Sequence, residues 1–409
     1  MITRTIALWA LNENFLNQRM SFIAGPRQIG KTTMVKSFLK KISQGDNYFN
    51  WDTISLKQKF AQNPLFFKEK APPVQKGKRN WIVFDEIHKY PNWKNLLKGY
   101  FDEFKDDFQF VITGSARLDL FRMSGDSLIG RYFLYKMFPL GLKDLISKKY
   151  DFTKQWNPGL PLKNIPETNS DYSNTVENLI NISGFPEPFL NGTKDFYQRW
   201  KEAHISLLIN EDLRDLTRII QIKKLETLIF LLPERIGSPL SLNSLSKILE
   251  CSYGSIKIWL EAFEKVFLTF SLPPYSQRLS RSVVKEKKHY FWDWGIIDDP
   301  GIRFENFIAV QLLRAVSSWS EWGKGKYELF YIRTKDGLEI DFAITCNNKL
   351  SMLVEAKVSD SEPSKSFKNI KNKLGNPLSF QIVKSKGFYK NTQTDVIVIG
   401  VDRFLQILP

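Results

Sequence analysis

Short apolar runs alternate with longer amphipathic runs over the first third of the chain. A run of four to eight apolar residues predicts a strand, and apolar positions that recur every three or four residues predict a helix. Strands are expected at Met20–Ala24, Tyr48–Trp51, Trp81–Glu86, Phe108–Ile112 and Arg131–Phe138, and helices at Lys31–Lys40, Leu56–Ala61 and Trp93–Phe104. Because strands and helices alternate, the pattern favours a parallel sheet with helices on both faces.

The pattern changes in the middle of the chain. Lys154–Asn174 is rich in Pro, Asn and Ser and has little periodicity, which predicts a boundary. Helices are expected after it at Gln198–Leu208, Asp212–Ile219 and Lys224–Leu232. Two short helices, Ser241–Leu249 and Ser255–Phe267, are then joined by a turn with a glycine. This is the helix-turn-helix pattern, although an ordinary helical hairpin looks the same. Leu268–Leu272, the turn at Pro273 and Pro274, and the run Lys285–Tyr290 could supply a wing.

The last part of the chain has the order α-β-β-β-α-β, followed by one further strand. Helices are expected at Phe304–Ala315 and Lys365–Leu374, and strands at Tyr327–Arg333, Glu339–Thr345, Met352–Lys357, Phe380–Val383 and Asp395–Ile399. A chain of 409 residues is too long for a single core. We therefore expect an α/β protein with four parts: the parallel sheet in residues 1–150, a linker and helical lid in 151–235, a winged helix-turn-helix in 236–285 and an α/β domain in 286–409.

One loop between an expected strand and an expected helix fits the phosphate-binding pattern G-x-x-x-x-G-K-[ST]. The loop and the next residue are Gly25, Pro26, Arg27, Gln28, Ile29, Gly30, Lys31, Thr32 and Thr33. Glycines let the backbone turn tightly and point its N–H groups at phosphate oxygens, and the helix N-terminus adds a partial positive charge. Lys31 is expected to reach the β- and γ-phosphates, and the Thr32 hydroxyl to bind Mg²⁺.

A second feature strengthens the expectation of nucleotide hydrolysis. The apolar run that begins at Trp81 ends in Asp85 and Glu86. An Asp at the end of a strand beside the phosphate loop supplies a contact to Mg²⁺. The Glu that follows it can polarise the attacking water, so Glu86 is the expected general base.

Acidic residues also occur inside the expected strands of the last part. Asp341 lies within one strand, and Glu355 and Lys357 lie at the end of the next, where alternation places them on one face. Two carboxylates suit Mg²⁺, and a lysine beside them could orient a metal-activated water. Glu305, on the preceding helix, could complete the site. An exposed Glu–Lys pair on an edge strand fits the spacing equally well.

The net charge of +16 favours a polyanionic partner, most simply nucleic acid, over a basic surface that only confers solubility. No apolar run approaches 18 residues, so we expect no membrane span. Two distant cysteines and three scattered histidines predict neither a disulfide framework nor a His-rich zinc site. A reducing, cytoplasmic location fits this cysteine usage.

Taken together, these motifs resemble those of archaeal and bacterial AAA+ ATPases of largely uncharacterised function with a winged helix and a C-terminal restriction-endonuclease-like domain. The resemblance covers essentially the whole chain. The segments that carry it are GPRQIGKTT (Gly25–Thr33), FDEIHKYPNWKNLLKGYFDE (Phe84–Glu103), ITGSARLDL (Ile112–Leu120), LIGRYFLYKMFPLGLKDL (Leu128–Leu145), SGFPEP (Ser183–Pro188), EDLRDL (Glu211–Leu216), FENFIAVQLLR (Phe304–Arg314), EIDFAI (Glu339–Ile344) and VEAK (Val354–Lys357).

The resemblance implies roles for further residues. It favours ATP, with Mg²⁺, as the bound nucleotide. A polar residue that senses the γ-phosphate is implied at Ser115, with Thr113 as second choice. Arg131 is implied to contact nucleotide, as an arginine finger acting across a subunit boundary.

The last part resembles the PD-(D/E)xK nuclease superfamily. Its pattern falls on Glu305, Asp341, Glu355 and Lys357, with a nuclease Mg²⁺ at Asp341 and Glu355.

Two functions fit these features. The first is a cytoplasmic ATPase that hydrolyses ATP with Mg²⁺ and binds DNA, with metal-dependent cleavage by the C-terminal domain as an extension. The alternative is an ATP-dependent regulatory switch that binds DNA or a protein partner and never cleaves, in signalling, defence or a toxin–antitoxin pair. Both are compatible with an oligomer or a protein partner.

Overall fold

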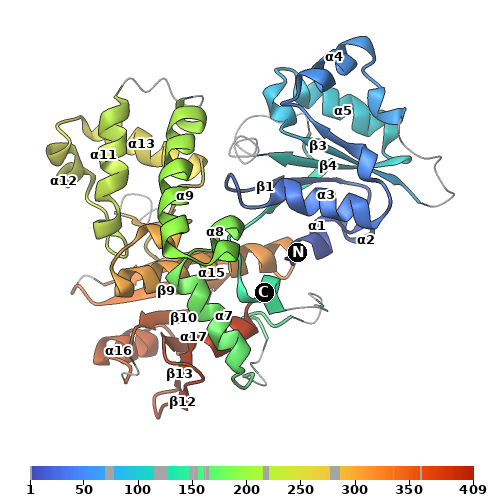
Figure 1. The fold of residues 1–409 in the computed structure, drawn as a ribbon. Coiled ribbons are helices and arrows are strands. Elements are labelled where there is room, and N and C mark those ends of the chain that lie inside the picture. The colour runs from blue at the N-terminus through green and yellow to red at the C-terminus, as the bar shows by residue number, and fades with distance from the viewer. Residues whose placement is uncertain are drawn as a thin grey trace. The chain divides into compact units, whose positions relative to one another are not determined.

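The computed structural model describes residues 2–69, 78–114, 128–146, 151, 155–160, 162, 165–214, 221–276, 286–334, 336–359 and 362–409. The chain forms two compact units, Met1–Phe138 and Pro139–Pro409, which are coloured from blue to cyan and from green to red in Figure 1. The four ranges expected from the sequence are finer than this division and stay a prediction.

The first unit is built on a five-stranded parallel sheet with the order β2-β3-β4-β1-β5. Its strands are β1 (Met20–Ala24), β2 (Tyr48–Asn50), β3 (Asn80–Asp85), β4 (Phe108–Gly114) and β5 (Tyr132–Lys136), and its longer helices are α3 (Lys31–Lys41), α4 (Ile54–Gln62) and α5 (Trp93–Phe104). Strands β1, β3 and β4 are buried throughout, as expected of a sheet covered on both faces. The expected parallel sheet is therefore confirmed, with strand ends shifted by at most two residues.

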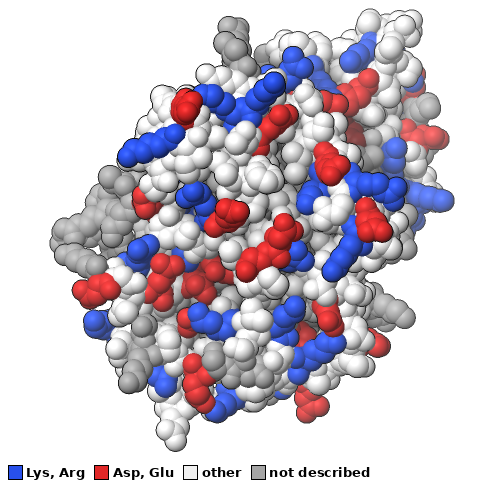
Figure 2. Space-filling model, turned by 60° about the vertical axis from the view of Figure 1, so that its left-hand side comes forward, with Lys and Arg blue, Asp and Glu red and all other residues white. Residues whose placement is uncertain are grey.

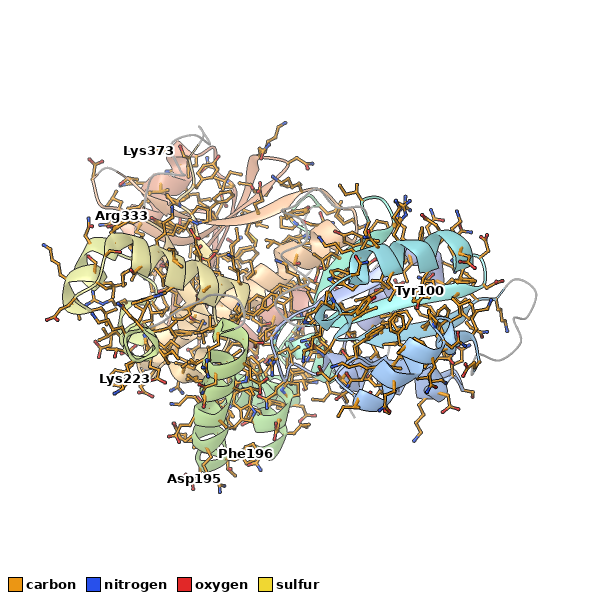
Figure 3. The ribbon with its side chains drawn as sticks, turned by 90° about the horizontal axis from the view of Figure 1, so that it is seen from above. Tyr100, Asp195, Phe196, Lys223, Arg333 and Lys373 are labelled. Carbon is orange, nitrogen blue, oxygen red and sulfur yellow. The ribbon has the colours of Figure 1, made fainter. Side chains whose placement is uncertain are left out.

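Aromatic side chains show how helices cover both faces of this sheet. Trp81 and Phe84 are three residues apart on β3 and point to opposite faces. Phe38 of α3 packs edge-on against Trp81, with ring centroids 4.8 Å apart. Tyr100 of α5, labelled in Figure 3, lies 5.9 Å from Phe84 and 4.8 Å from Phe67 on the other face. Helices α3 and α5 thus bury opposite faces, which leaves the loops at the carboxyl ends of the strands for function.

The second unit begins with helices. They are α6 (Leu142–Ile146), α7 (Ser170–Asn181), α8 (Pro186–Asn191), α9 (Lys194–Leu207), a π-helical turn (Leu208–Leu213) and α11 (Ile222–Leu231). The helix expected at Asp212–Ile219 falls mostly outside the described residues. Helices α12 (Leu242–Ile248) and α13 (Tyr253–Lys265) follow, each capped at its N-terminus by a serine side chain, Ser241 and Ser252.

A two-stranded antiparallel hairpin, β6 (Thr269–Leu272) and β7 (Lys288–Phe291), comes after α13. Two helices and a hairpin are the parts that a winged helix needs, and that assignment stays a prediction. The side chain of Asn306 accepts from the N–H of Phe291 (2.8 Å) and donates to its carbonyl (2.7 Å). This buried pair of hydrogen bonds fixes the end of β7 on the long helix α15 (Pro300–Glu321).

The C-terminal sheet has six strands in the order β12-β13-β11-β10-β9-β8. Its elements are β8 (Tyr327–Arg333), β9 (Glu339–Cys346), β10 (Lys349–Lys357), α16 (Lys365–Lys373), β11 (Leu378–Val383), β12 (Tyr389–Asn391), β13 (Val396–Gly400) and α17 (Val401–Ile407). Strands β8, β9 and β10 are antiparallel, whereas β10, β11 and β13 are parallel. The expected order is present, with β12 and α17 in addition. The register pairs Phe342 of β9 with Val354 of β10, so that Asp341 and Glu355 are the next residues along the two strands.

Candidate nucleotide and carboxylate sites

The loop between β1 and α3 is held tightly against the chain that follows β5. A Cβ atom on Gly25 would lie 2.5 Å from the backbone oxygen of Met137, so only glycine fits there without a shift of the backbone. Gly30, with φ of 97°, caps α3 in the left-handed region. The guanidinium of Arg4 also donates to the Ile29 carbonyl at 3.3 Å. These contacts fix the shape of the loop from three sides.

The side chain of Lys31 is folded back onto this loop. Its Nζ donates to the backbone oxygens of Gly25 (2.8 Å) and Pro26 (2.7 Å). Lys31 begins α3, so its backbone N–H lies in the first turn, where helical N–H groups have no partner within the helix. The loop thus brings an ammonium group and the N-terminus of a helix to one place, which is the arrangement that binds phosphate.

Asp85 collects three hydroxyl groups at the end of β3. Its Oδ2 accepts from Thr32 Oγ1 at 2.8 Å and from the Tyr48 hydroxyl, and its Oδ1 accepts from Thr113 Oγ1. Asp85 is only 3% exposed. The carboxylate and the Thr32 hydroxyl are hard oxygen donors that lie side by side, so these residues fit Mg²⁺.

Glu86 follows in a left-handed conformation, with φ of 57°. Such a conformation is uncommon for a residue with a side chain and often marks a functional position. Its N–H is fixed by the Thr113 carbonyl at 2.9 Å, and its Oε2 lies 3.3 Å from His88 Nε2. Burial raises the pKa of Glu86 to about 7; nearby Lys31 opposes this shift and Asp85 adds to it. A carboxyl group with this pKa is suited to accept a proton near neutral pH.

The expected nuclease residues come together in the second unit, but a lysine lies among them. Glu355 Oε1 pairs with Lys357 Nζ at 3.0 Å, and Asp341 Oδ2 accepts from the N–H of Ala356 at 2.9 Å. Lys288 Nζ lies 3.7 Å from Glu305 and 3.9 Å from Asp341. We call the acidic residues of this group the carboxylate cluster: Glu305, Glu339, Asp341 and Glu355. Among the described residues, no three acidic, His or Cys side chains are arranged to hold a metal ion.

Comparison with known proteins identifies the first part of the chain. Residues 17–146 match the family model described as AAA domain. This stretch is similar to AAA domains, and we call it the AAA domain below. Residues 173–298 and 300–403 match two domains of unknown function, DUF8612 and DUF4143, which assign no activity to the second unit. The nuclease-like and winged-helix assignments therefore stay predictions.

Similar whole proteins are distant. An uncharacterized protein of Mycobacterium tuberculosis and one of Mycobacterium bovis are each 22% identical over 344 residues, covering 80% of this chain and 68% of the relative. One from Haemophilus influenzae is 23% identical and covers 74% and 78%. The solved structure of the Aeropyrum pernix ORC1 protein in complex with DNA is 12% identical, with a TM-score of 0.32, over 72% of this chain and 88% of that one. A likeness this weak carries no argument about function.

The resemblance implies nucleotide contacts for Ser115 and Arg131, and the structure describes only the second of them. Ser115 lies outside the described residues, whereas Thr113, the second choice, contacts Asp85 inside the AAA domain. Arg131 precedes β5, whose first residue pairs with Met20 at the start of β1. The phosphate loop follows the carboxyl end of β1. Arg131 therefore lies at the opposite, amino-terminal ends of the strands.

Arg131 instead forms an ion pair with Asp102 of α5, at 2.8 Å, near the surface. Its side chain does not reach the phosphate loop of its own chain. A role as arginine finger stays a prediction, and it requires a second copy of the chain.

Tyr48 is the residue of the AAA domain that sequence reasoning missed. It begins β2, and its hydroxyl contacts Asp85 because β2 pairs in parallel with β3. Lys36 lies 4.3 Å above the Tyr48 ring, which adds a cation–π contact beside the site. No local pattern marks Tyr48, since its role depends on the pairing of two strands about thirty residues apart.

Among the described residues, no helix is long and apolar enough to cross a membrane.

Proposed function

We propose that this protein binds ATP with Mg²⁺ at the AAA domain and hydrolyses it. The observation that carries the proposal is the Asp85 carboxylate, which holds the hydroxyls of Thr32 and Thr113 beside a phosphate loop that already positions Lys31. Phosphoryl transfer needs little covalent chemistry from a protein, so catalysis consists of positioning and of stabilising charge. The AAA domain has groups for both tasks.

The roles follow from where the groups lie. The Lys31 ammonium, which here binds two backbone oxygens, exchanges them for the β- and γ-phosphate oxygens. Thr32 and Asp85 would hold Mg²⁺, which, when bound, neutralises phosphate charge. Glu86 accepts the proton of the attacking water, and Thr113 links the adjacent strand to Asp85.

A magnesium titration tests this function. We expect the full chain to hydrolyse ATP only with Mg²⁺. Asp85→Asn should raise the Mg²⁺ concentration needed for half-maximal turnover by about 10- to 100-fold, because the loss of a residue that holds a metal or orients its ligands weakens metal affinity by that factor. Asp106→Asn, an exposed carboxylate of the same unit, is the matched control. No Mg²⁺-dependent turnover by the wild type, or an unchanged titration for Asp85→Asn, would contradict the proposal.

DNA is the partner that we propose for the protein. The support is the net charge of +16, because polyanions are attracted to basic proteins. Basic and acidic side chains are mixed over the face drawn in Figure 2, without a single continuous basic area. If DNA is held mainly by electrostatic attraction, its affinity for this protein should fall strongly as the salt concentration rises.

The alternative function, a switch that binds but never cleaves, is favoured by the position of Lys288. Its ammonium lies among the carboxylates to which a nuclease would bind metal. We expect supercoiled plasmid to stay intact with the wild type in Mg²⁺ or Mn²⁺, as measured by gel electrophoresis. Cleavage that is lost in Asp341→Ala would support the nuclease instead, and cleavage retained in Asp341→Ala would point to a contaminant.

A further inference from the structure

Strand β7 presents two side chains to the carboxylate cluster. Lys288 and Tyr290 alternate with His289 along the strand, so both point to the same face. The Tyr290 hydroxyl donates to Glu305 Oε1 at 2.8 Å, and Lys288 Nζ lies 3.7 Å from the same oxygen. His289 points the other way, toward Glu264 at 4.0 Å. The strand therefore delivers one positive charge and one hydroxyl to Glu305.

The surroundings of Lys288 are those of a bound cation. Its Nζ lies 2.5 Å from Glu339, 3.7 Å from Glu305 and 3.9 Å from Asp341, and 5.5 Å from the centre of the Tyr331 ring. The residue is 0% exposed. Burial acts to lower the pKa of Lys288, but the charges of Glu305, Asp341 and Glu339 outweigh it and raise the pKa. The amine nitrogen of Lys288 is therefore surrounded by acidic groups inside the protein.

The carboxylates are partly buried, and one of them is incompletely paired. Glu355 is 6% exposed, and its Oε2 has no hydrogen-bond partner, although its Oε1 pairs with Lys357. Glu305 is closed in from the other side by Gly237, where an added Cβ would lie 2.8 Å from Glu305 Oε2. Burial, followed by the charge of Asp341, raises the pKa of Glu305 to about 8. Glu305 and Asp341 are thus close enough for their charges to repel each other.

We propose that Lys288 is the resident cation of the carboxylate cluster and occupies the space that a divalent metal ion would need between Glu305, Glu339 and Asp341. Oxygen ligands bind Mg²⁺ or Ca²⁺ at about 2.0–2.6 Å, so an ammonium within 2.5 to 3.9 Å of three carboxylates leaves no room for a second cation. Lys357 and Arg333 do not fill this space. Lys357 pairs with Glu355, and Arg333, labelled in Figure 3, reaches Glu339 from the surface at 3.8 Å.

The position of Lys288 is fixed by the backbone, which makes the blocking durable. Strand β7 pairs with β6, so that Lys288 lies opposite Leu272, and Lys288 also bridges to Pro239. The Lys287 carbonyl accepts from the N–H of Leu240 at 2.9 Å. At the other end of β7, Asn306 fixes Phe291 on α15. These contacts hold Lys288 in the position that blocks the cluster.

Metal binding to the full chain tests this inference independently of ATP hydrolysis and of DNA cleavage. The probe is Mn²⁺ without nucleotide, with the free ion followed by electron paramagnetic resonance. We expect Lys288→Met to bind one more Mn²⁺ than the wild type, at least about tenfold more tightly than any binding there by the wild type. Lys287→Met removes an exposed charge from the neighbouring position and is expected to behave as the wild type does. The added binding should disappear in Lys288→Met/Asp341→Asn.

A stability readout covers the case in which the unpaired carboxylates weaken the fold of Lys288→Met. Ligands that bind only the folded state raise the unfolding temperature, so Mn²⁺ should raise the melting temperature of Lys288→Met and of Lys288→Gln but leave that of the wild type unchanged. Equal Mn²⁺ binding by the wild type and Lys288→Met would show that Lys288 does not block the cluster. An absence of added binding in both Lys288 variants would show that the space is no metal site. Either result overturns the proposal.

Discussion

Replacing Glu86 by Gln is expected to slow ATP hydrolysis about 1,000-fold while nucleotide affinity stays within a few-fold of the wild type, because a positioned general base contributes on the order of 10²–10⁴ in rate. The amide has the size of the carboxyl group but cannot accept the proton of the attacking water. Burial raises the pKa of Glu86 to about 7, so the ionised form that acts as the base is gained as the pH rises through the neutral range. The substitution therefore removes a proton acceptor and little else.

The measurement is single-turnover hydrolysis together with equilibrium binding of a fluorescent ATP analogue. Glu103→Gln, an exposed glutamate of α5, is the matched control. If binding and turnover were lost together, Glu86 would have a structural role in the site and would not be shown to act as the base. Its left-handed backbone and its contact with His88 are the features on which such a role would rest. Unchanged turnover would exclude it as the base.

Replacing Lys31 by Ala is expected to lower kcat/KM for ATP by about 100-fold, the usual size for the loss of one charged group that stabilises the transition state. In the described structure the ammonium already lies over the loop, bound to the oxygens of Gly25 and Pro26. It has only to exchange these two acceptors for phosphate oxygens. The alanine variant keeps the loop, which is shaped by Gly25 against Met137, but has no charge there.

Steady-state turnover by the two proteins checks this expectation, and circular dichroism verifies that the variant is folded. Lys40→Ala, an exposed lysine of the same helix α3, should leave kcat/KM unchanged. Equal hydrolysis by the wild type and Lys31→Ala would rule out ATP hydrolysis at this site.

The two predictions rest on residues that the sequence identified, and the reason is that both belong to local patterns. The loop from Gly25 to Thr32 depends on eight consecutive residues, and Asp85 and Glu86 end an apolar run. Parallel strands in one sheet bring their carboxyl ends to the same edge, so the contact of Thr32 with Asp85 follows once the sheet is parallel. The core strands were predictable for the same reason, because each is a short and mainly apolar run.

Contacts that depend on strand order were not predictable in this way. Tyr48 reaches Asp85 only because β2 lies beside β3. Arg131 pairs with Asp102 and not with nucleotide of its own chain. Because β5 runs parallel to β1 and Arg131 precedes β5, Arg131 lies at the amino-terminal ends of the strands, whereas the phosphate loop lies at their carboxyl ends. The implied contact of Arg131 with nucleotide would need another chain, which a single sequence does not place.

The carboxylate cluster separates the two kinds of information most clearly. Alternation along two strands indicated that Asp341, Glu355 and Lys357 would meet, and the register of β9 and β10 brings the first two together. Nothing in the periodicity indicated that Lys288, more than fifty residues earlier, would place its ammonium between Glu339, Glu305 and Asp341.

The sequence by itself determined the phosphate loop, the acidic strand end and the parallel sheet, because local spacing controls which groups share a turn, a strand face or a strand end. Only the tertiary structure decided the partners of Asp85, the position of Arg131 and the charge at the centre of the carboxylate cluster. These depend on which strands pair and in which register, and that choice is made by packing over the whole unit.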